Sequence, residues 1–307
     1  MELNLAIIAY KAGDRMSKRC AERCAKELES LGCQILMGPS GATDNPYPVF
    51  LASASQKIDM ALILGGDGTA LAAARHLAPE GIPILAVNAG GHLGFLTEPV
   101  EVLDSKSQAW QRLLDDRYAV QRRMLLQSRI VDGVSAPEDN RDSEVFWALN
   151  EMCIKPASAD RMITSMLEME IDGEVIDQYH GDGIIVASPT GSTCYTVAAN
   201  GPIVHPGMAA LIVTPICPLS LSSRPIVLPP GARVSIWPLE DHDLTTKLWT
   251  DGVLASSIWP GQKVEVSSAT KEAEFLLLRD NYSYYRTLRE KLYWAGARIR
   301  YDNNHRN

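Results

Sequence analysis

The feature that most restricts the fold of this chain is an apolar run broken by a Gly-Gly-Asp-Gly turn. The stretch reads ALILGGDGTALAAARHL, from Ala61 to Leu77, and helix-forming residues follow the turn directly. If residues 59–64 form a parallel strand, Gly65 and Gly66 lie just past its carboxyl end, where open α/β sheets bind ligands. Asp67 then projects into the ligand crevice.

Two interpretations of this turn stay open on its own residues. In the functional one, Gly66 and Gly68 let a ligand approach the backbone, and Thr69 caps a helix whose first amides face an anion. In the other, Asp67 or Thr69 only caps a helix in an ordinary strand-to-helix connection. Short glycine motifs recur by chance, so the choice depends on other parts of the chain.

Apolar runs alternate with helical patterns through the first third of the chain. Strands are predicted over residues 3–10, 33–37, 59–64 and 83–88. A helix is predicted over residues 15–32, ending at Gly32, with Cys20, Cys24, Leu28 and Leu31 on one face. This order predicts an α/β domain with a parallel sheet and crossover helices.

From about Tyr118 the pattern changes to short β-rich segments separated by turn residues. They predict a second, mainly antiparallel domain, in which the charged segment 136–144 is the tip of a hairpin. The end of the chain returns to helical periodicity through Tyr285, Leu288 and Leu292, and we expect it to pack back on the first domain.

Length, composition and charge limit the class of protein. The 307 residues leave room for two cores, which we assign to an α/β domain of residues 1–117 with 285–307 and a mainly β domain of residues 118–284. The 46% hydrophobic and 21% charged residues are typical of a folded globular protein. A net charge of -8 without a basic block argues against nucleic-acid binding.

The sequence leads us to expect neither a membrane span nor a signal peptide. No apolar stretch approaches the roughly 20 residues that span a bilayer, and the start lacks a basic region followed by a cleavage site. We therefore expect a cytoplasmic protein without membrane contact. Of the six cysteines, Cys20 and Cys24 are one helical turn apart and are candidate metal ligands, but buried thiols are the favoured interpretation because no matching His or Cys pair accompanies them.

Two more glycine-containing turns follow predicted strands. Residues 88–94 form a flexible turn after the strand at 83–88, so that two such turns line one cleft. Phe95 either stacks on a base or fills the core, and the core is favoured. Residues 189–193 present hydroxyls and free amides at a turn that opens a helix, which suits ribose hydroxyls and carboxamides, with a plain capping turn as the alternative.

Taken together, these strings resemble the NAD kinase family, whose members transfer the γ-phosphoryl of ATP, or of polyphosphate in some members, to the 2′-hydroxyl of the adenosine ribose of NAD. The resemblance covers most of the chain, through the strings at residues 65–69, 88–98, 150–151, 182–206, 214–229 and 288–294. It implies a Rossmann-like α/β domain related to those of phosphofructokinases and diacylglycerol kinases, joined to a β-sandwich-like domain. It also implies a homotetramer or homodimer, with part of the dinucleotide site at a subunit interface.

The resemblance implies roles for individual residues, with Asp67 as the catalytic carboxylate and Asn150 and Glu151 at the acceptor ribose. The NAD-binding positions that it implies are Asp67, Gly68, Phe95, Asn150, Glu151, Asp182, Thr190, Thr193, Cys194, Tyr195 and Ala198. The phosphate- or ATP-binding positions are Gly65, Gly66, Gly68, Thr69, Asn88, Gly91 and His92.

Three positions depart from the family pattern. Leu219 stands where many members have His, so any polar role of that side chain is absent. His92 replaces a common Arg or Asn in the second glycine turn. Val253 replaces a frequent Gln, which weakens the assignment of the neighbouring Asp251.

The mechanism that follows makes Asp67 the acceptor of the 2′-hydroxyl proton, a role that contributes ~10²–10⁴-fold in rate. Mg²⁺ is expected to bridge the triphosphate oxygens, and Asp67 as a metal ligand is the alternative. A lipid kinase of the diacylglycerol or sphingoid type is a rival function, because it shares the GGDGT turn. A non-catalytic dinucleotide sensor is another, whereas a Rossmann dehydrogenase is disfavoured because GxGxxG does not follow the first strand.

Overall fold

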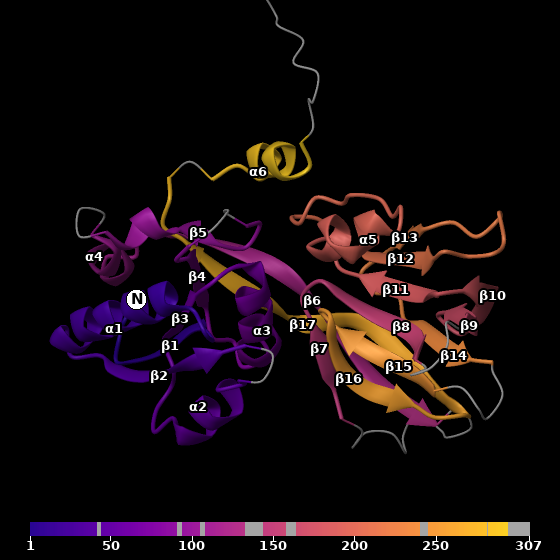
Figure 1. Ribbon diagram of the computed structural model, residues 1–307, viewed down its shortest axis with the longest axis horizontal. Helices are drawn as coiled ribbons and strands as arrows, with labels where there is room; N and C mark the ends of the chain where they lie inside the picture. The colour runs from indigo at the N-terminus through magenta and orange to yellow at the C-terminus, as the bar shows by residue number, and fades with distance from the viewer. Residues whose placement is uncertain are drawn as a thin grey trace, which may run out of the picture.

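The computed structural model describes residues 1–41, 44–90, 94–104, 108–132, 144–157, 164–239, 245–280 and 282–293. These residues form a helix-covered parallel sheet at the amino-terminal end and a β-rich part beside it (Figure 1). No helix in these ranges is long and apolar enough to cross a membrane. Of the predicted hairpin tip at 136–144, only Glu144 lies within the described residues.

The amino-terminal part is a parallel sheet with helices on both faces (Figure 1). Its strands are β1 (Leu5–Lys11), β2 (Gln34–Ser40), β3 (Met60–Leu64), β4 (Ile84–Asn88) and the short β5 (Glu98–Pro99). Their order is β2-β1-β3-β4, with β5 beside β4, and Ile8 pairs with Leu62, which pairs with Leu85. Every residue of β3 and β4 is buried, as expected for central strands covered on both faces. The predicted α/β domain is confirmed.

Among the described residues, four helices and one 3-10 turn cover this sheet. Helices α1 (Arg15–Ser30) and α4 (Ala109–Leu114) pack on one face, and α2 (Tyr47–Ser53) and α3 (Asp67–Leu77) on the other; the 3-10 turn spans Val100–Leu103. Gly32 ends α1 as predicted, with φ +89 and with its N–H donating to the Glu29 carbonyl at 3.0 Å. Leu31 was wrongly placed on the buried face, because it follows the last helical residue and is 51% exposed.

A long mixed sheet carries the parallel strands into the β-rich part. Its further strands are β6 (Ala119–Asp132), β7 (Phe146–Ala148), β9 (Ser165–Ile171), β10 (Glu174–Gly181), β14 (Val234–Pro238) and β17 (Gln262–Leu277). Strand β17 pairs in parallel with β4, at Phe275 and Ile84, and antiparallel with β6 and β14. Because one sheet runs through both parts, the domain boundary at residues 117 and 118 stays a prediction.

The second sheet is entirely antiparallel. Its strands, in the order β13-β12-β11-β8-β15-β16, are β8 (Glu151–Ala157), β11 (Gly183–Ala187), β12 (Leu211–Ile216), β13 (Ile226–Leu228), β15 (Thr245–Thr250) and β16 (Val253–Ile258). One apolar core joins it to the mixed sheet, with Leu126 and Val266 from one sheet and Val186 and Leu248 from the other. This packing confirms the β-sandwich-like prediction.

The last described helix, α6 (Tyr284–Lys291), lies outside both sheets (Figure 1). The predicted face was wrong by one residue, since Tyr284 is buried and Tyr285 is 69% exposed. The Tyr284 ring lies 6.3 Å from the ring of Phe95 in the α/β part and 4.8 Å from that of His205 in the β-rich part. Helix α6 therefore contacts both parts rather than the first alone, and residues 294–307 of the predicted segment lie outside the described ranges.

Candidate active site

The first glycine turn places Asp67 at the start of α3, directly after the carboxyl end of β3. Gly66 is the N-cap, so the prediction that Thr69 caps the helix was wrong. Instead Thr69 packs against Gly65, where an added Cβ would lie 2.4 Å from Thr69 Oγ1. A Cβ at Gly66 or Gly68 would meet nothing within 4 Å, which leaves open space beside the backbone for a ligand.

The Asp67 carboxylate joins the first glycine turn to the second. Its Oδ2 accepts a hydrogen bond from the Phe95 amide at 2.7 Å, and its Oδ1 accepts from the Leu96 amide at 3.2 Å and from Thr97 Oγ1 at 3.5 Å. A carboxylate has about four acceptor positions, so one remains for a ligand hydroxyl. The prediction that the two turns lie together is therefore confirmed, with Asp67 between them.

Gly94 is required by this arrangement, because a Cβ there would lie 1.8 Å from Asp67 Oδ1. We expect Gly94→Ala to displace the carboxylate and to lower kcat by about 10- to 100-fold, as misplaced catalytic groups do. Gly90→Ala, in the same turn, is the matched control, because a Cβ there meets nothing within 4 Å. Steady-state kinetics of both variants checks this, and equal kcat values for the two would contradict it.

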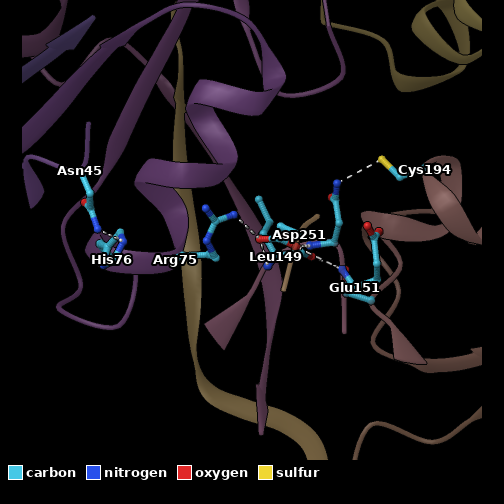
Figure 2. A network of polar contacts seen from close by, with 9 residues as sticks. Asn45, Arg75, His76, Leu149, Glu151, Cys194 and Asp251 are labelled. Carbon is cyan, nitrogen blue, oxygen red and sulfur yellow. Dashed lines mark hydrogen bonds and ion pairs between the residues drawn. The ribbon is translucent and has the colours of Figure 1, made fainter. Parts of the chain in front are cut away.

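A buried carboxylate, Asp251, positions the Asn150-Glu151 pair (Figure 2). Its side chain is 0% exposed and accepts hydrogen bonds from the backbone amides of Leu149 at 3.0 Å, Asn150 at 2.7 Å and Glu151 at 3.2 Å. Arg75, from the last turn of α3, donates to it at 3.4 Å. Burial raises the pKa of this carboxyl, and Arg75 and the three amides act against that rise.

The Asn150 and Glu151 side chains present acceptors that nothing in the described residues satisfies. Asn150 Nδ2 donates to Cys194 Sγ at 3.1 Å, whereas Asn150 Oδ1 and Glu151 Oε2 are buried without partners. The residue is exposed as a whole, but desolvation of its thiol, followed by the charges of Glu151, Asp67 and Asp251, raises the pKa of Cys194 to about 12. Cys194 therefore lies in the electrostatic field of both the first glycine turn and the Asn150-Glu151 pair. The two unpartnered oxygens of that pair suit the hydroxyls of a sugar.

Glu151 gives the folded protein a distinctive pH dependence. Burial, and secondarily Asp251, raises the pKa of Glu151 from its ordinary 4.5 to about 8. Between these values the unfolded chain releases the Glu151 proton while the folded protein keeps it, so stability falls as pH rises, by up to ~1.4 kcal/mol per pH unit. We expect Glu151→Gln, which mimics the protonated acid, to flatten the curve of unfolding free energy between pH 5 and 8. Urea titrations measure this, and the exposed Glu174→Gln should keep the wild-type slope.

The third predicted turn contacts the backbone at the Asn150-Glu151 pair. Ser188 Oγ donates to the Leu149 carbonyl at 2.5 Å, and the Ser188 amide donates to the Asn150 carbonyl at 2.8 Å. A Cβ at Gly191 would lie 2.1 Å from that Asn150 oxygen. As predicted, a helix follows, first a 3-10 turn at Gly191–Thr193 and then α5 (Tyr195–Ala198). Three segments distant in sequence thus meet at Asn150.

A cavity of about 360 Å³ adjoins this meeting point. It is lined by Glu151, Cys153, Lys155, Pro156, Tyr195, Trp249 and Gly252. Lys155 Nζ donates to the Tyr195 hydroxyl at 3.2 Å and fixes that ring at the wall. Two residues predicted to bind NAD therefore border one hollow.

The remaining predicted residues are more scattered. Thr190 accepts a hydrogen bond from Arg123 at 3.4 Å, Thr193 Oγ1 donates to the Thr190 carbonyl at 3.4 Å, and Asn88 Oδ1 accepts from the Gly90 amide at 3.1 Å. Asp182 precedes β11 and so lies about 17 Å from the turn that follows this strand. Ala198 ends α5 and is exposed. Gly91 and His92 lie outside the described residues.

The thiols and a possible metal centre were also predicted. Cys24, Cys33 and Cys153 are buried as expected, Cys20 is half-buried, and Cys194 and Cys217 are exposed. The last two correct the general expectation of buried thiols: Cys217 directly follows the end of β12, and Cys194 lies between the 3-10 turn at Gly191–Thr193 and α5. Within the described ranges, no group of three or more His, Cys, Asp or Glu side chains could hold a metal ion.

Sequence reasoning missed three residues of this region. Arg75 and Arg123 are ordinary basic residues in their local patterns, and Tyr284 was placed off the buried face. Asp251 was assigned only weakly, although its glycine neighbour and its φ of 48 mark a tight turn between β15 and β16. The Asp251-Gly252 dipeptide between two β-rich segments was the available sequence signal, since Asp-Gly is a typical two-residue hairpin turn.

The fold and the arrangement of the turns define a class of two-part proteins, in which a helix-covered parallel sheet is joined to a β-sandwich-like part. Yeast NADH kinase complexed with NADH superposes with a TM-score of 0.79 at 22% identity, covering 96% of this chain and 89% of that chain. An NAD kinase from Archaeoglobus fulgidus in complex with ATP has a TM-score of 0.68 at 21% identity, covering 94% and 98%. At these identities the likeness establishes the fold.

Sequence comparison identifies the family. The sequence model of the ATP-NAD kinase N-terminal domain matches residues 6–118, and that of the C-terminal domain matches residues 149–278. NAD kinase 1 of Thermosynechococcus vestitus is 67% identical over 308 residues, which is 100% of both chains. NAD kinase 1 of Synechocystis sp. is 64% identical over 310 residues, covering 100% of this chain and 99% of the relative. The chain therefore belongs to the NAD kinase family.

Proposed function

We propose that this protein is an NAD kinase that transfers the γ-phosphoryl of ATP to the 2′-hydroxyl of the adenosine ribose of NAD and so forms NADP. The observation that carries the proposal is the Asp67 carboxylate, fixed by the backbone of residues 95 and 96 with one acceptor position free. The high identity to curated NAD kinases over the full chain supports it.

In the proposed mechanism, Asp67 accepts the proton of the 2′-hydroxyl as the oxygen attacks phosphorus, and the bond from phosphorus to the leaving oxygen of ADP breaks. The free acceptors of Asn150 and Glu151 hold the neighbouring ribose hydroxyls. Phosphoryl transfer depends on positioning and charge more than on covalent chemistry, so fixed carboxyl and amide groups suffice for the acceptor side.

Magnesium fits this site as part of the ATP substrate rather than as a resident ion. The described residues offer no cluster of three ligands, and three of about four acceptor positions of Asp67 are already used. A Mg²⁺ that arrives on the triphosphate needs few protein ligands and neutralises charge on the phosphate oxygens. We therefore favour Asp67 as the base over Asp67 as a metal ligand.

The assembly and location are also proposals. We propose a homotetramer or homodimer, as the family resemblance implies, with part of the dinucleotide site at a subunit interface. A cytoplasmic location stays a prediction from the sequence.

The test is incubation of the protein with NAD, ATP and Mg²⁺ and measurement of NADP, repeated with polyphosphate as donor. NADP formation supports the kinase. NAD binding without ATP consumption would favour the dinucleotide sensor instead. Phosphorylation of a dispersed sphingoid base or diacylglycerol, with none of NAD, would favour the lipid kinase.

A further inference from the structure

Two adjacent arginines of β6 have opposite environments. The Arg122 side chain is 61% exposed and pairs with Glu274 Oε1 at 3.0 Å, whereas Arg123 is 1% exposed. Neighbouring residues of a strand face opposite sides of the sheet, so one arginine is solvated and the other is enclosed. An enclosed guanidinium stays charged, and it requires a counter-charge or full hydrogen bonding.

Arg123 has neither in the described part of the chain. Its two terminal nitrogens donate to Thr190 Oγ1 at 3.4 Å, to Gln121 Oε1 at 2.8 Å and to the Tyr282 hydroxyl at 3.4 Å, all of them neutral groups. No described carboxylate lies within 4.0 Å, and Arg123 Nε is buried without a partner. A buried positive charge in this state is costly unless an anion joins it.

A second unsatisfied group faces the same region. The Tyr284 hydroxyl of α6 is buried without a partner, and the Tyr284 ring lies against Phe95 at 6.3 Å. Burial lowers the pKa of Arg123, and Tyr282, Tyr284 and Asp67 act against this shift, which places all three within electrostatic reach of the guanidinium. The Tyr284 ring lies against Phe95, whose amide donates to Asp67, and Arg123 donates to Tyr282, two residues before Tyr284. Contacts therefore connect both unsatisfied groups to the proposed catalytic carboxylate.

We propose that Arg123 and Tyr284 together bind a phosphate group of the nucleotide substrate beside Asp67. A phosphate supplies both the missing charge and several acceptor oxygens, and the planar guanidinium matches it geometrically. The proposal rests on the proposed kinase function for its biological ligand. The same chemistry is offered by the pyrophosphate of NAD and by the phosphates of ATP.

The test uses inorganic pyrophosphate as the probe, titrated calorimetrically into the full-length protein. We expect Arg123→Gln to weaken pyrophosphate binding by about 10- to 100-fold, the usual effect of losing a charged hydrogen-bonding group. Arg122→Gln is the matched control and should bind within about twofold of the wild type, since its side chain is solvated. Equal affinities for the two variants, or no binding by the wild type, would overturn the proposal.

Tyr284→Phe keeps the proposal testable if Arg123→Gln does not fold. The substitution removes only the hydroxyl and keeps the ring contacts with Phe95 and His205. We expect several-fold weaker pyrophosphate binding at an unchanged melting temperature, and unchanged binding would overturn the role of this pair. If Arg123 has only a structural role, Arg123→Gln should melt at a lower temperature, while its folded molecules bind pyrophosphate with wild-type affinity.

Separate titrations with ATP and with NAD distinguish the two sources of the phosphate. If Arg123→Gln loses affinity for ATP alone, the site binds the phosphates of ATP. If it loses affinity for NAD alone, the site binds the pyrophosphate of NAD. Affinity unchanged for both would overturn the proposal. If the wild type forms no NADP while Arg123→Gln still loses pyrophosphate binding, the anion site stands and the kinase function fails.

Discussion

Replacing Asp67 by Asn is expected to reduce kcat by ~10²–10⁴-fold while NAD still binds, because the proton of the ribose hydroxyl then has no acceptor. The structure adds a second reason. An amide nitrogen at either Oδ position would face the Phe95 or Leu96 N–H group, two donors opposed, so the second glycine turn would also shift. The loss should therefore lie in kcat more than in the affinity for NAD.

Thr97→Val is the matched control for this experiment. It removes the 3.5 Å hydrogen bond from Oγ1 to Asp67, the weakest of the three, and also the acceptor of the Gly94 amide at 3.1 Å, while both backbone donors to the carboxylate stay. We expect a change in kcat of less than about tenfold, since both lost hydrogen bonds are neutral and each contributes about 1 kcal/mol. Kinetics at saturating ATP and calorimetric titration of NAD separate the two effects. Near wild-type turnover by Asp67→Asn would remove Asp67 from the mechanism.

The local features of the fold were predictable because each depends on a few neighbouring residues. The apolar run of β3, the glycines after it and the helix formers of α3 dictate a strand, a turn and a helix in sequence. Gly65 shows the limit of this reasoning. A glycine is required at position 65 because an added Cβ would clash with Thr69, whereas the sequence pattern suggests only a capping role for that threonine.

Contacts between distant segments could not be predicted in this way. Arg75 and Asp251 are 176 positions apart, and Asp251 and Asn150 are 101 positions apart, so only the folded topology brings them together. Alternation along β6 predicts that Arg122 and Arg123 face opposite sides, but not which side is enclosed. The site was therefore predictable where a motif is continuous, and not where a single polar side chain from another element completes it.

Replacing Asp251 by Asn is expected to have the largest effect on stability, because the change removes the counter-charge of Arg75 inside the protein. One side-chain oxygen keeps its bonds to the amides of residues 150 and 151, while the new amide nitrogen opposes both the Leu149 N–H and Arg75. Breaking a buried pair by removing one partner costs about 3–5 kcal/mol, and this loss should appear in the free energy of unfolding from urea titration.

The same substitution should raise the KM for NAD, since Asp251 holds the backbone of Asn150 and Glu151, and none of its hydrogen bonds within the described residues goes to Asp67. Asp280→Asn is the control, because Asp280 pairs with Arg112 at 2.8 Å but is 84% exposed, and its loss should change stability little. The loss of unfolding free energy in Arg75→Met should lie between those of Asp251→Asn and Asp280→Asn, because Asp251 then keeps its three amide donors. If Asp251→Asn unfolded at the wild-type urea concentration with an unchanged KM, the Asn150-Glu151 pair would have to owe its position to the Ser188 contacts alone.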